Sequence, residues 1–562
     1  MKSPPALDGI MPRTTNVAQR LVERLVAHGV THVFCVPGES YLAVLDALCD
    51  VKEQITLVAC RHEAGAANMA EAYGKVTGKP GICMVTRGPG AAHAFVGVHT
   101  AQQDSTPLIL FVGQVTRGDK GRGAFQELDY PAVFGSVAKW AAELDRPDRI
   151  AEFIDRAFAT ARQGRNGPVV LALPEDVLAE PGGEPAAPPT PPAHAGLDRE
   201  FLASVGERLV RSERPLVILG GSGWSQASLD ALADWLEAHA LPVVLSFRRK
   251  DLIDNEHPCY AGDLGLSPNP KLVERAKSAD LILAIGARLG ENPTQGYSLF
   301  ARQQTAARLI HIHPGAEELG RVWPAAICAV ADVAPAGLAL ASLNPGRGWR
   351  EWRDAAHADW EAFAQPIVVE GLVNLSEVVA HMAHALPSDA IVTNGAGNFA
   401  TWLHRFYRHR RFRTQLAPTS GAMGYGFPAA IAAKLIHPAR EVVCFAGDGD
   451  FMMTSGELAT AVQYGANIVT VVVDNGSYGT IRMHQERAYP GRVIATELTN
   501  PDFAAFAKSF GAWGATVERT ADFPAAFAAA RQVGKPAIIH LKTDVEAIAP
   551  GRTLRQLRAG GA

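Results

Sequence analysis

The sequence is poor in cysteine and has no excess of charge of either sign. Seven cysteines lie scattered among 562 residues without a C-x-x-C pair, so neither a disulfide framework nor a zinc site is indicated. The 53 Lys and Arg nearly balance the 57 Asp and Glu, so the composition favours neither nucleic acid nor a membrane surface. No run approaches the ~18 apolar residues that span a bilayer. We therefore expect a cytoplasmic globular protein with no nucleic-acid and no membrane partner.

Short β-branched runs alternate with Ala-rich helical stretches along the whole chain. Strand-like runs occupy residues 32–36, 81–85, 108–112 and 169–173, then 215–221, 241–246, 281–286 and 307–313, and finally 390–398 to 537–544. Such alternation is typical of parallel sheets covered by helices on both faces. The predicted fold class is α/β, with three Rossmann-like, doubly wound parallel-sheet domains.

A Pro-rich, nearly uncharged stretch supplies the first domain boundary. EPGGEPAAPPTPPAHAG at 180–196 has the composition of a linker. We place a first domain at 1–180, the linker at 181–196 and a central domain at 197–340. A Trp-rich helical connector is predicted at 341–386 and a third domain at 387–562.

The stretch GDGDFMMTSGELATAVQYGANIVTVVVDN predicts one βαβ unit. Residues 441–446 form a buried strand in this interpretation, and 468–473 the returning strand. Thr454 and Glu457 fit the capping box that begins a helix, and Gly465 would follow that helix.

The two strands of this unit deliver their carboxyl ends to one edge of the sheet, where open α/β folds bind ligands. Asp448 follows the first strand and Asn475 the second, so a carboxylate and an amide oxygen lie side by side and suit Mg²⁺ shared with a diphosphate. Gly447 and Gly449 let the backbone approach phosphate closely. The alternative is an ordinary tight turn in a Rossmann-like sheet.

GDG, a spacer of 24 residues (450–473) and then DN resemble the GDG…NN motif of thiamine-diphosphate enzymes. Asp474 stands where the family has its first Asn. The resemblance implies that Asp448, the side chain of Asn475 and the carbonyl of Ser477 are ligands of Mg²⁺. Substitution of the first Asn leaves that ligand set intact.

The segment CRHEAGAANMAEAYGKVTGKPG at 60–81 resembles the RHE-x-x-A motif of the same family. The resemblance implies that Glu63 is the catalytic glutamate, which activates the aminopyrimidine ring of the cofactor. In the family this glutamate serves a cofactor held by another subunit, which implies an obligate homodimer or homotetramer. Read alone, Glu63 is an acid of a helix first turn, favoured there by the helix dipole.

Three further segments, GAGN, SGAMGYGF and GAFQE, resemble the acetolactate-synthase group of this family. In that group the first segment opens the third domain and contacts the diphosphate. The second supplies the residue that bends the cofactor, and the third lines the reaction centre. In that group an apolar residue, at the position of Ile481 here, also lies over the reactive carbon of the cofactor. By resemblance, the additional cofactor-binding residues are Gly395, Gly397, Asn398, Met423, Asp450 and Ile481, and those at the reaction centre are Phe125 and Gln126. Core packing is the alternative for Met423 and Phe125.

Three further residues depart from the acetolactate-synthase pattern. Arg87 replaces a Ser, and His93 replaces the last Asn of the GPGATN segment. Either could contact substrate, and His93 could orient it or move protons as a catalytic residue; both could equally be structural. His484 stands where biosynthetic synthases carry a Trp that favours a larger acceptor, which argues against a dedicated branched-chain role.

The central domain raises the question of a second cofactor. ILGGSG at 218–223 is a Gly-rich turn after a strand, and some relatives bind FAD or a nucleotide in this domain. His313 and Gly315 stand in a segment where FAD-binding relatives carry acids, and this loss removes partners for the ribose hydroxyls. FAD stays an open alternative, disfavoured by the missing acids.

The resemblance covers nearly the whole chain and assigns the three domains to the pyrimidine, a central Rossmann-like fold and the diphosphate. It implies a lyase or transferase, dependent on thiamine diphosphate and Mg²⁺, that decarboxylates a small 2-oxo acid such as pyruvate and ligates the carbanion-enamine to a second carbonyl. The alternative with the same cofactor is a 2-hydroxyacyl-CoA lyase, or an oxalyl-CoA-type or aryl 2-oxo acid decarboxylase. A nicotinamide oxidoreductase and a non-catalytic cofactor-binding protein are the remaining alternatives.

Overall fold

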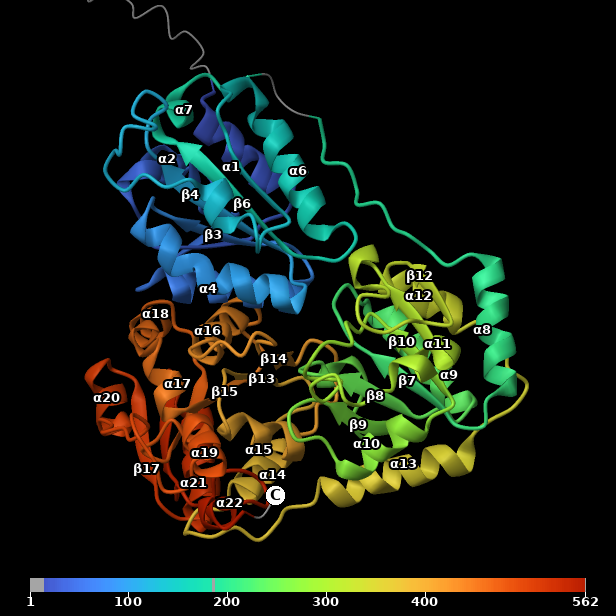
Figure 1. Cartoon of the computed structure of the whole chain (residues 1–562). Helices are drawn as coiled ribbons and strands as arrows, with labels where there is room; N and C mark the ends of the chain where they lie inside the picture. The colour runs from blue at the N-terminus through green and yellow to red at the C-terminus, as the bar shows by residue number, and fades with distance from the viewer. Residues whose placement is uncertain (1–14, 184–186, 561–562) are drawn as a thin grey trace, which may run out of the picture.

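The chain folds into three α/β domains, each built on a six-stranded parallel sheet. A computed structural model describes residues 15–183 and 187–560. In Figure 1 the N-terminal domain lies at the top, the central domain at the right and the C-terminal domain at the lower left. The predicted α/β class with three parallel sheets is confirmed.

The N-terminal sheet has the strand order β2-β1-β3-β4-β6-β5, and its inner strands β3, β4 and β6 are buried along their whole length. Burial of both faces explains why these strands read as continuous apolar runs. The elements are α1 (Val17–Ala27), β1 (His32–Cys35), η1 (Glu39–Tyr41), α2 (Leu42–Cys49), β2 (Thr56–Ala59), α3 (Glu63–Thr77), β3 (Gly81–Val85), α4 (Pro89–Asp104), β4 (Leu108–Gln114), α5 (Tyr130–Phe134), β5 (Trp140–Glu143), η2 (Pro147–Arg149), α6 (Ile150–Arg162), β6 (Pro168–Pro174) and α7 (Glu175–Ala179).

The central sheet has the order β12-β11-β10-β7-β8-β9, which reverses between β10 and β7 as in a Rossmann fold. This reversal opens a crevice at the carboxyl ends of the strands. The elements are α8 (Arg199–Arg211), β7 (Pro215–Leu219), α9 (Gln226–Ala238), β8 (Val243–Ser246), η3 (Lys250–Leu252), β9 (Tyr260–Leu264), α10 (Pro270–Ser278), β10 (Leu281–Ile285), α11 (Arg302–Arg308), β11 (Leu309–His313), η4 (Ala316–Glu318), β12 (Ile327–Val330), α12 (Val333–Leu340) and α13 (Arg350–Phe363).

The C-terminal sheet has the order β14-β13-β15-β16-β18-β17, with the GDG segment between its two inner strands β15 and β16. The elements are α14 (Leu375–Ala385), β13 (Ile391–Asn394), α15 (Phe399–Phe406), β14 (Gln415–Leu416), α16 (Gly426–Ile436), β15 (Val442–Gly447), α17 (Asp448–Met452), η5 (Ser455–Glu457), α18 (Leu458–Gln463), β16 (Val469–Asp474), α19 (Gly479–Ala488), α20 (Phe503–Ser509), β17 (Trp513–Val517), η6 (Thr520–Asp522), α21 (Phe523–Gln532), β18 (Ala537–Lys542) and α22 (Leu554–Arg558).

Two connections join the domains. The described residues between α7 and α8 form no helix or strand, and this segment runs along the outside of the molecule (Figure 1). The helical segment after α12 is divided between two domains. Helix α13 packs against β9 of the central sheet, whereas α14 packs against α15 of the C-terminal domain.

One hydrophobic core joins the N-terminal and C-terminal domains. Helices α3 and α4 cover one face of the N-terminal sheet, and α3 packs on its other side against α16. Small residues on these helices permit the close approach, since a Cβ on Gly97 would collide with the backbone of Ala67. The turn that begins α3 is therefore held against the C-terminal domain.

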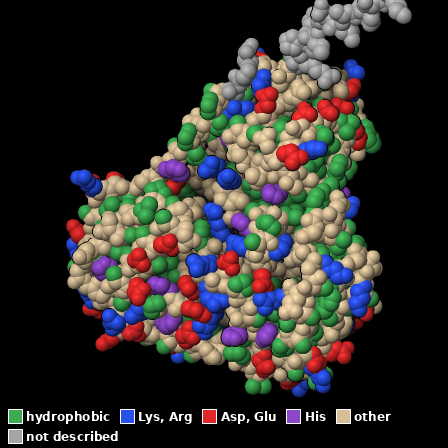
Figure 2. Space-filling view, turned by 180° about the vertical axis from the view of Figure 1, so that it is seen from behind, with side chains coloured by type: hydrophobic (Ala, Val, Ile, Leu, Met, Phe, Trp, Pro, Cys, Tyr) green, Lys and Arg blue, Asp and Glu red, His purple; other side chains and the backbone are tan. Residues whose placement is uncertain are grey.

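The surface carries acidic and basic side chains side by side, and neither sign alone covers the face seen in Figure 2. This distribution agrees with the formal net charge of -4. None of the helices in the described ranges combines the length and the apolar content that crossing a bilayer requires.

The predicted capping box after the GDG segment is wrong. Thr454 makes no side-chain cap, because its hydroxyl donates to the carbonyl of Gly424 at 2.8 Å. The carboxylate of Glu457 instead accepts from the backbone N–H groups of Arg61 and His62. A contact between domains thus takes the groups that a local cap would have used.

Candidate functional site

The GDG segment and the end of β16 lie together at the carboxyl edge of the C-terminal sheet. Strands β15 and β16 are parallel neighbours, with Gly447 opposite Val473. Asp448 begins α17 directly after β15, and Asn475 directly follows β16. A cavity of about 220 Å³ opens there. Ten predicted site residues line it: Gly397, Asn398, Met423, Gly447, Asp448, Gly449, Asp450, Asn475, Ser477 and Ile481.

Asp448 is buried and held in one orientation. Its Oδ1 accepts from the N–H of Gly449 at 2.8 Å, and its Oδ2 accepts from Nδ2 of Asn500 at 2.8 Å. Burial raises the pKa of Asp448 to about 6, against the opposing effect of these hydrogen bonds. A carboxylate that is costly to ionise without a counter-charge is a fitting partner for a cation.

Asp474, at the position of the family's first Asn, takes part in a hydrogen-bond network behind Asp448. The same amide of Asn500 donates to Oδ1 of Asp474 at 2.8 Å, while His540 and Lys542 lie 2.7 Å from its Oδ2. Burial alone would raise the pKa of Asp474, but the hydrogen bonds from these three side chains lower it. The substituted acid is therefore compensated locally, and it fixes the amide that orients Asp448.

Asn500 is a site residue that sequence reasoning missed. It lies in the loop before α20, and only its position in the fold brings it between two strand ends. The sequence TNPDF offers a turn and a helix start, a pattern that occurs in many loops without a ligand.

Asp450 joins the turn after β13 to the turn before α16. Its Oδ1 accepts from the N–H groups of Ala396 at 3.1 Å and Gly424 at 2.9 Å. A Cβ on Gly395 would collide with this carboxylate, so the GAGN turn rests on Asp450. Gly395 itself does not line the cavity. Burial raises the pKa of Asp450 to about 7.

Apolar and glycine residues shape the rest of the cavity. Side chains would collide at Gly447, where a Cβ would meet the ring of Phe399, and at Gly449, where it would meet Tyr478. Ile481 is 54% exposed although it is apolar and lies on the cavity wall. The cavity thus combines an oxygen-rich end, glycine backbone and an exposed apolar wall, which fits a diphosphate with an attached ring system.

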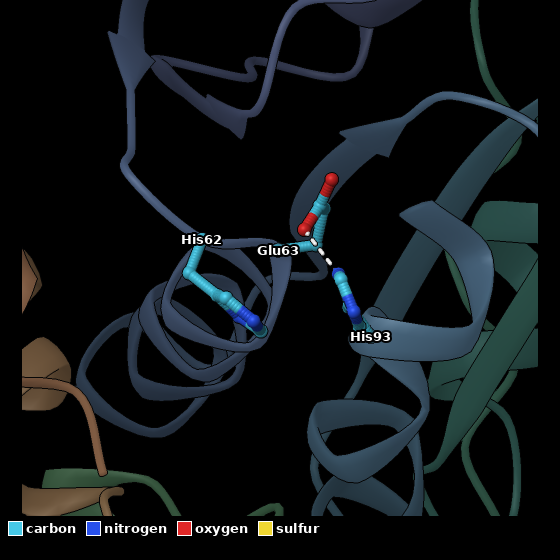
Figure 3. A group of neighbouring side chains, drawn as sticks. All are labelled: His62, Glu63 and His93. Carbon is cyan, nitrogen blue, oxygen red and sulfur yellow. Dashed lines mark hydrogen bonds and ion pairs between the residues drawn. The ribbon is translucent and has the colours of Figure 1, made fainter. Parts of the chain in front are cut away.

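A second cluster lies at the first turn of α3, where Glu63 follows the N-cap residue His62. Nδ1 of His93, on α4, lies 2.9 Å from Oε2 of Glu63, and its ring stacks on His62 with centroids 4.5 Å apart (Figure 3). Ligand atoms of the three residues lie within 4.8 Å of one another. The side chain of Glu63 is 13% exposed and that of His93 is 52% exposed.

Gln126 and Phe125 lie near this cluster. Gly88 packs against Gln126, since a Cβ added to Gly88 would lie 2.8 Å from the carbonyl oxygen of Gln126. Two residues further along the chain, Gly90 packs against the carboxylate of Glu63. Gln126 has a φ of 64°, a strained conformation for a residue other than glycine, and its buried Oε1 has no partner among the described residues. Phe125 is 74% exposed, so it does not serve as core packing within one chain.

The two halves of the predicted site do not meet within one chain. Every residue that lines the Asp448 cavity lies between residues 375 and 548. Glu63, His93, Phe125 and Gln126 all lie in the N-terminal domain and are absent from its wall. Apolar surface is exposed on both halves, at Phe125 and at Ile481.

The other two departures from the family pattern have local partners. The Arg87 side chain lies 3.1 Å from Glu175 and 3.6 Å from Glu39, so it is paired within its own domain. His484 lies 2.7 Å from the guanidinium of Arg487 on the same helix.

The central domain offers poor partners for the ribose of FAD at His313 and Gly315, where relatives carry acids, because Gly315 has no side chain and His313 is engaged with backbone. His311 and His313 are both buried, and their pKa values are lowered by burial. Nε2 of His311 lies 2.8 Å from the carbonyl of Ala287, and Nδ1 of His313 accepts from the N–H of Gly315. Both rings are thus engaged with backbone, and neither His313 nor Gly315 offers an acid to the ribose, so these two positions do not fit the group.

Three family models match the chain in the order of its domains. The model described as the N-terminal TPP binding domain of thiamine pyrophosphate enzymes matches residues 15–133. The central-domain model matches residues 202–342, and the C-terminal TPP binding domain matches residues 395–541.

Curated relatives are similar over nearly the whole chain. The acetolactate synthase large subunit of Parasynechococcus marenigrum (strain WH8102) is 32% identical over 559 residues, covering 95% of this chain and 88% of the relative. The isozyme 2 large subunit of Escherichia coli (strain K12) is 29% identical over 541 residues, covering 94% and 96%. The catabolic acetolactate synthase of Raoultella terrigena is 31% identical over 552 residues, covering 94% and 95%.

Proposed function

Since the chain belongs to the thiamine pyrophosphate enzyme family and is an acetolactate-synthase-like enzyme, we propose that it decarboxylates a 2-oxo acid such as pyruvate and joins the remaining acyl fragment to a second carbonyl. The proposal rests on the cavity that gathers Asp448 and Asn475 at the carboxyl edge of the C-terminal sheet. With pyruvate as donor and acceptor, one CO₂ leaves and one carbon–carbon bond forms, which gives acetolactate.

When bound, thiamine diphosphate supplies a nucleophilic carbon that adds to the donor carbonyl and holds the electron pair released with CO₂. In this proposal Asp448, Asn475 and the carbonyl of Ser477 hold Mg²⁺, an all-oxygen set that suits this ion. Asn500 keeps Asp448 oriented toward the metal. Gly397 and Asn398 would contact the diphosphate, in a turn that Gly395 anchors against Asp450, and Met423 and Ile481 would support the rings.

Glu63 is proposed to hold a proton at the pyrimidine ring of the cofactor, with His93 fixing its carboxylate through the 2.9 Å contact. In this proposal the exposed ring of Phe125 supplies an apolar surface for substrate, and Gln126, the next residue, orients the substrate. Arg87 and His484 have no part in this proposal, because each has a partner in its own domain.

The substitution Glu63→Gln tests the catalytic assignment. It keeps the shape of the side chain and removes the proton acceptor, so turnover should fall by roughly 10²–10⁴-fold. Binding of thiamine diphosphate, measured by calorimetry, should change little, while exchange of its C2 proton, measured by NMR, should slow as turnover does. Glu53→Gln, at an exposed acid of the same domain, is the control. If the C2 proton exchanges as fast in Glu63→Gln as in wild type, Glu63 takes no part in activating the cofactor.

We further propose that the complete site forms between two copies of the chain, as a dimer or tetramer. The separation of Glu63 from the wall of the Asp448 cavity supports this arrangement. Two inactive variants, Glu63→Gln and Asp448→Asn, should complement each other when they are refolded together. When the two variants mix at random, about half of the dimers are hybrids. In each hybrid one of the two sites has both native residues, so about a quarter of wild-type activity should return. No recovery with proven hybrid formation would place each site within one chain.

The choice of substrates separates the two candidate reactions. Incubation with pyruvate alone should yield acetolactate, identified by mass spectrometry, if the carboligase proposal is correct. Cleavage of a 2-hydroxyacyl or oxalyl thioester without a product from pyruvate would instead support the alternative reaction with the same cofactor. FAD has no role in this proposal, because His313 and Gly315 do not fit its ribose.

A further inference from the structure

The cluster at the first turn of α3 has the composition of a transition-metal site. His62 and Glu63 are neighbours where α3 begins, and His93 lies beside them on α4 (Figure 3). One ligand atom from each of these three side chains lies within 4.8 Å of the other two. Within residues 15–183 and 187–560, no other set of three His, Cys, Asp or Glu side chains could hold one metal ion in this way.

Two imidazoles and a carboxylate favour Zn²⁺ over Mg²⁺. Zinc binds histidine nitrogen and carboxylate oxygen, often with three protein ligands and a water in the fourth position, whereas Mg²⁺ prefers oxygen ligands alone. Both histidines are exposed, so an ion in solution can reach them. The cluster therefore differs in chemistry from the all-oxygen set proposed for Mg²⁺ at Asp448.

The separation of Glu63 and His93 already suits two ligands of one ion. Oε2 of Glu63 and Nδ1 of His93 lie 2.9 Å apart. Two ligands of a tetrahedral zinc ion lie roughly 3.3 Å apart, because Zn–N and Zn–O bonds are about 2.0–2.1 Å long. The ring of His62 stacks on that of His93 with centroids 4.5 Å apart, so rotation of this exposed side chain can bring a nitrogen to the same ion.

The backbone beneath the cluster is fixed by contacts between helices and between domains. Helices α3 and α4 pack directly against each other. The N–H of His62 donates to the carboxylate of Glu457 at 3.0 Å. A Cβ on Gly90 would lie 3.4 Å from Oε1 of Glu63, so α4 begins in contact with this carboxylate. Metal binding therefore requires rotation of side chains only, which keeps the cost of ordering small.

One hydrogen bond opposes the metal. Nδ1 of His62 accepts from the N–H of Ala64 at 3.1 Å and thereby caps α3. A neutral imidazole that binds zinc through Nε2 carries its proton on Nδ1, so this cap would be lost. Loss of an N-cap lowers the affinity by roughly fivefold. This factor is small beside the affinity that zinc gains from its protein ligands.

We propose that the chain without thiamine diphosphate binds one Zn²⁺ ion at His62, Glu63 and His93, and that this ion inhibits activation by the cofactor. Zinc would occupy the carboxylate assigned above to the pyrimidine ring, so the ion and the cofactor exclude each other. The inhibition rests on the proposed function, whereas the metal site rests on the geometry of the cluster. His93 is essential to it, because an Asn at this position, as in the GPGATN segment, supplies no imidazole.

Co²⁺, which absorbs visible light and shares nitrogen ligands with zinc, probes the site on the full chain freed of thiamine diphosphate. Excess Mg²⁺ is present to occupy the oxygen ligands at Asp448. We expect one Co²⁺ per chain, with a visible band stronger than that of hydrated Co²⁺, and loss of the band on addition of one equivalent of Zn²⁺.

Three Asn variants assign the ligands. His93→Asn and His62→Asn should each weaken Zn²⁺ binding by about 100-fold or more, since loss of a ligand costs more than the 10–100-fold of a lost partner behind it. Asn at position 62 keeps an acceptor for the N-cap, so α3 should still form. His99→Asn is the matched control, at a histidine of α4 outside the cluster, and it should bind Zn²⁺ like wild type.

Absence of the Co²⁺ band, or equal Zn²⁺ binding by His93→Asn and wild type, would overturn the metal site and leave the proposed reaction untouched. Addition of thiamine diphosphate with Mg²⁺ should abolish the band, and one equivalent of Zn²⁺ added first should slow exchange of the C2 proton at least about tenfold. A band that persists with the cofactor bound would overturn the inhibition. Exchange in Glu63→Gln, measured without zinc, tests the proposed function separately.

Discussion

Gly65 lies at the contact between the turn that carries Glu63 and the C-terminal domain, and Gly65→Ala should disrupt this contact. An added Cβ would lie 2.7 Å from Cδ and 2.9 Å from Cγ of Glu457, and closer still to Oε1. Glu457 is fully buried, and its carboxylate accepts from Arg61 N, His62 N and Thr460 Oγ1. The whole Glu457 side chain would have to move, and at least one of its hydrogen bonds would be lost.

The cost can be worked out from these contacts. Overpacking a filled core costs about 1–3 kcal/mol, and losing one hydrogen bond to a charged group costs roughly 1.5–3 kcal/mol. Alanine in a helix is better than glycine by about 1 kcal/mol, which offsets part of this loss. The net destabilisation should be roughly 1.5–5 kcal/mol.

Thermal unfolding and hydrogen exchange measure this effect. The unfolding midpoint of Gly65→Ala should fall, and amides at the start of α3 should exchange faster. Gly456→Ala is the matched control, because Gly456 adjoins Glu457 but a Cβ there would have nothing within 4 Å. The double variant Gly65→Ala with Glu457→Ala should lose less stability than the sum of the single variants. Equal midpoints for Gly65→Ala and Gly456→Ala would refute the reasoning.

Three further predictions concern the site and the response to pH. Asn500→Ala should weaken binding of Mg²⁺ with thiamine diphosphate by roughly 10–100-fold, because Asp448 and Asp474 lose their shared donor; unchanged affinity in calorimetry would contradict this. Burial lowers the pKa of His313 from 6.5 to about 4, so the unfolded chain takes up its proton first as pH falls. Unfolding free energy should drop by about 1.6 kcal/mol between pH 6.5 and 5 from this residue, and His313→Asn should lose that part of the slope in denaturant titrations. Phe125→Ala should leave the unfolding midpoint unchanged and lower kcat/KM, since the ring is 74% exposed in the single chain; full activity would exclude it from the reaction centre.

The inner strands of all three sheets could be predicted from the sequence, and the edge strands could not. The runs at 81–85 and 108–112 mark β3 and β4, which are buried on both faces and therefore uniformly apolar. The six edge strands β2, β5, β9, β12, β14 and β17 were not predicted. Most of them are partly exposed, and β14 has only two residues, so their apolar signal is weak.

The site could be predicted where one segment carries its own pattern. GDG and the DN after the returning strand were sufficient to place Asp448 and Asn475 at one sheet edge, because parallel strands end on the same side. Asn500, His540 and Lys542 could not be found in this way, since they approach Asp474 only through the tertiary fold. The contact between His93 and Glu63 depends likewise on the packing of two helices.

The core shared by the first and third domains has a practical consequence for cutting the protein into pieces. Helices α3 and α4 pack with α16 in one continuous cluster. A fragment that ends at the Pro-rich linker would expose this Ala-rich surface to water and invite aggregation. The central domain has cores of its own, so it is the part of the chain that should survive excision as a folded unit.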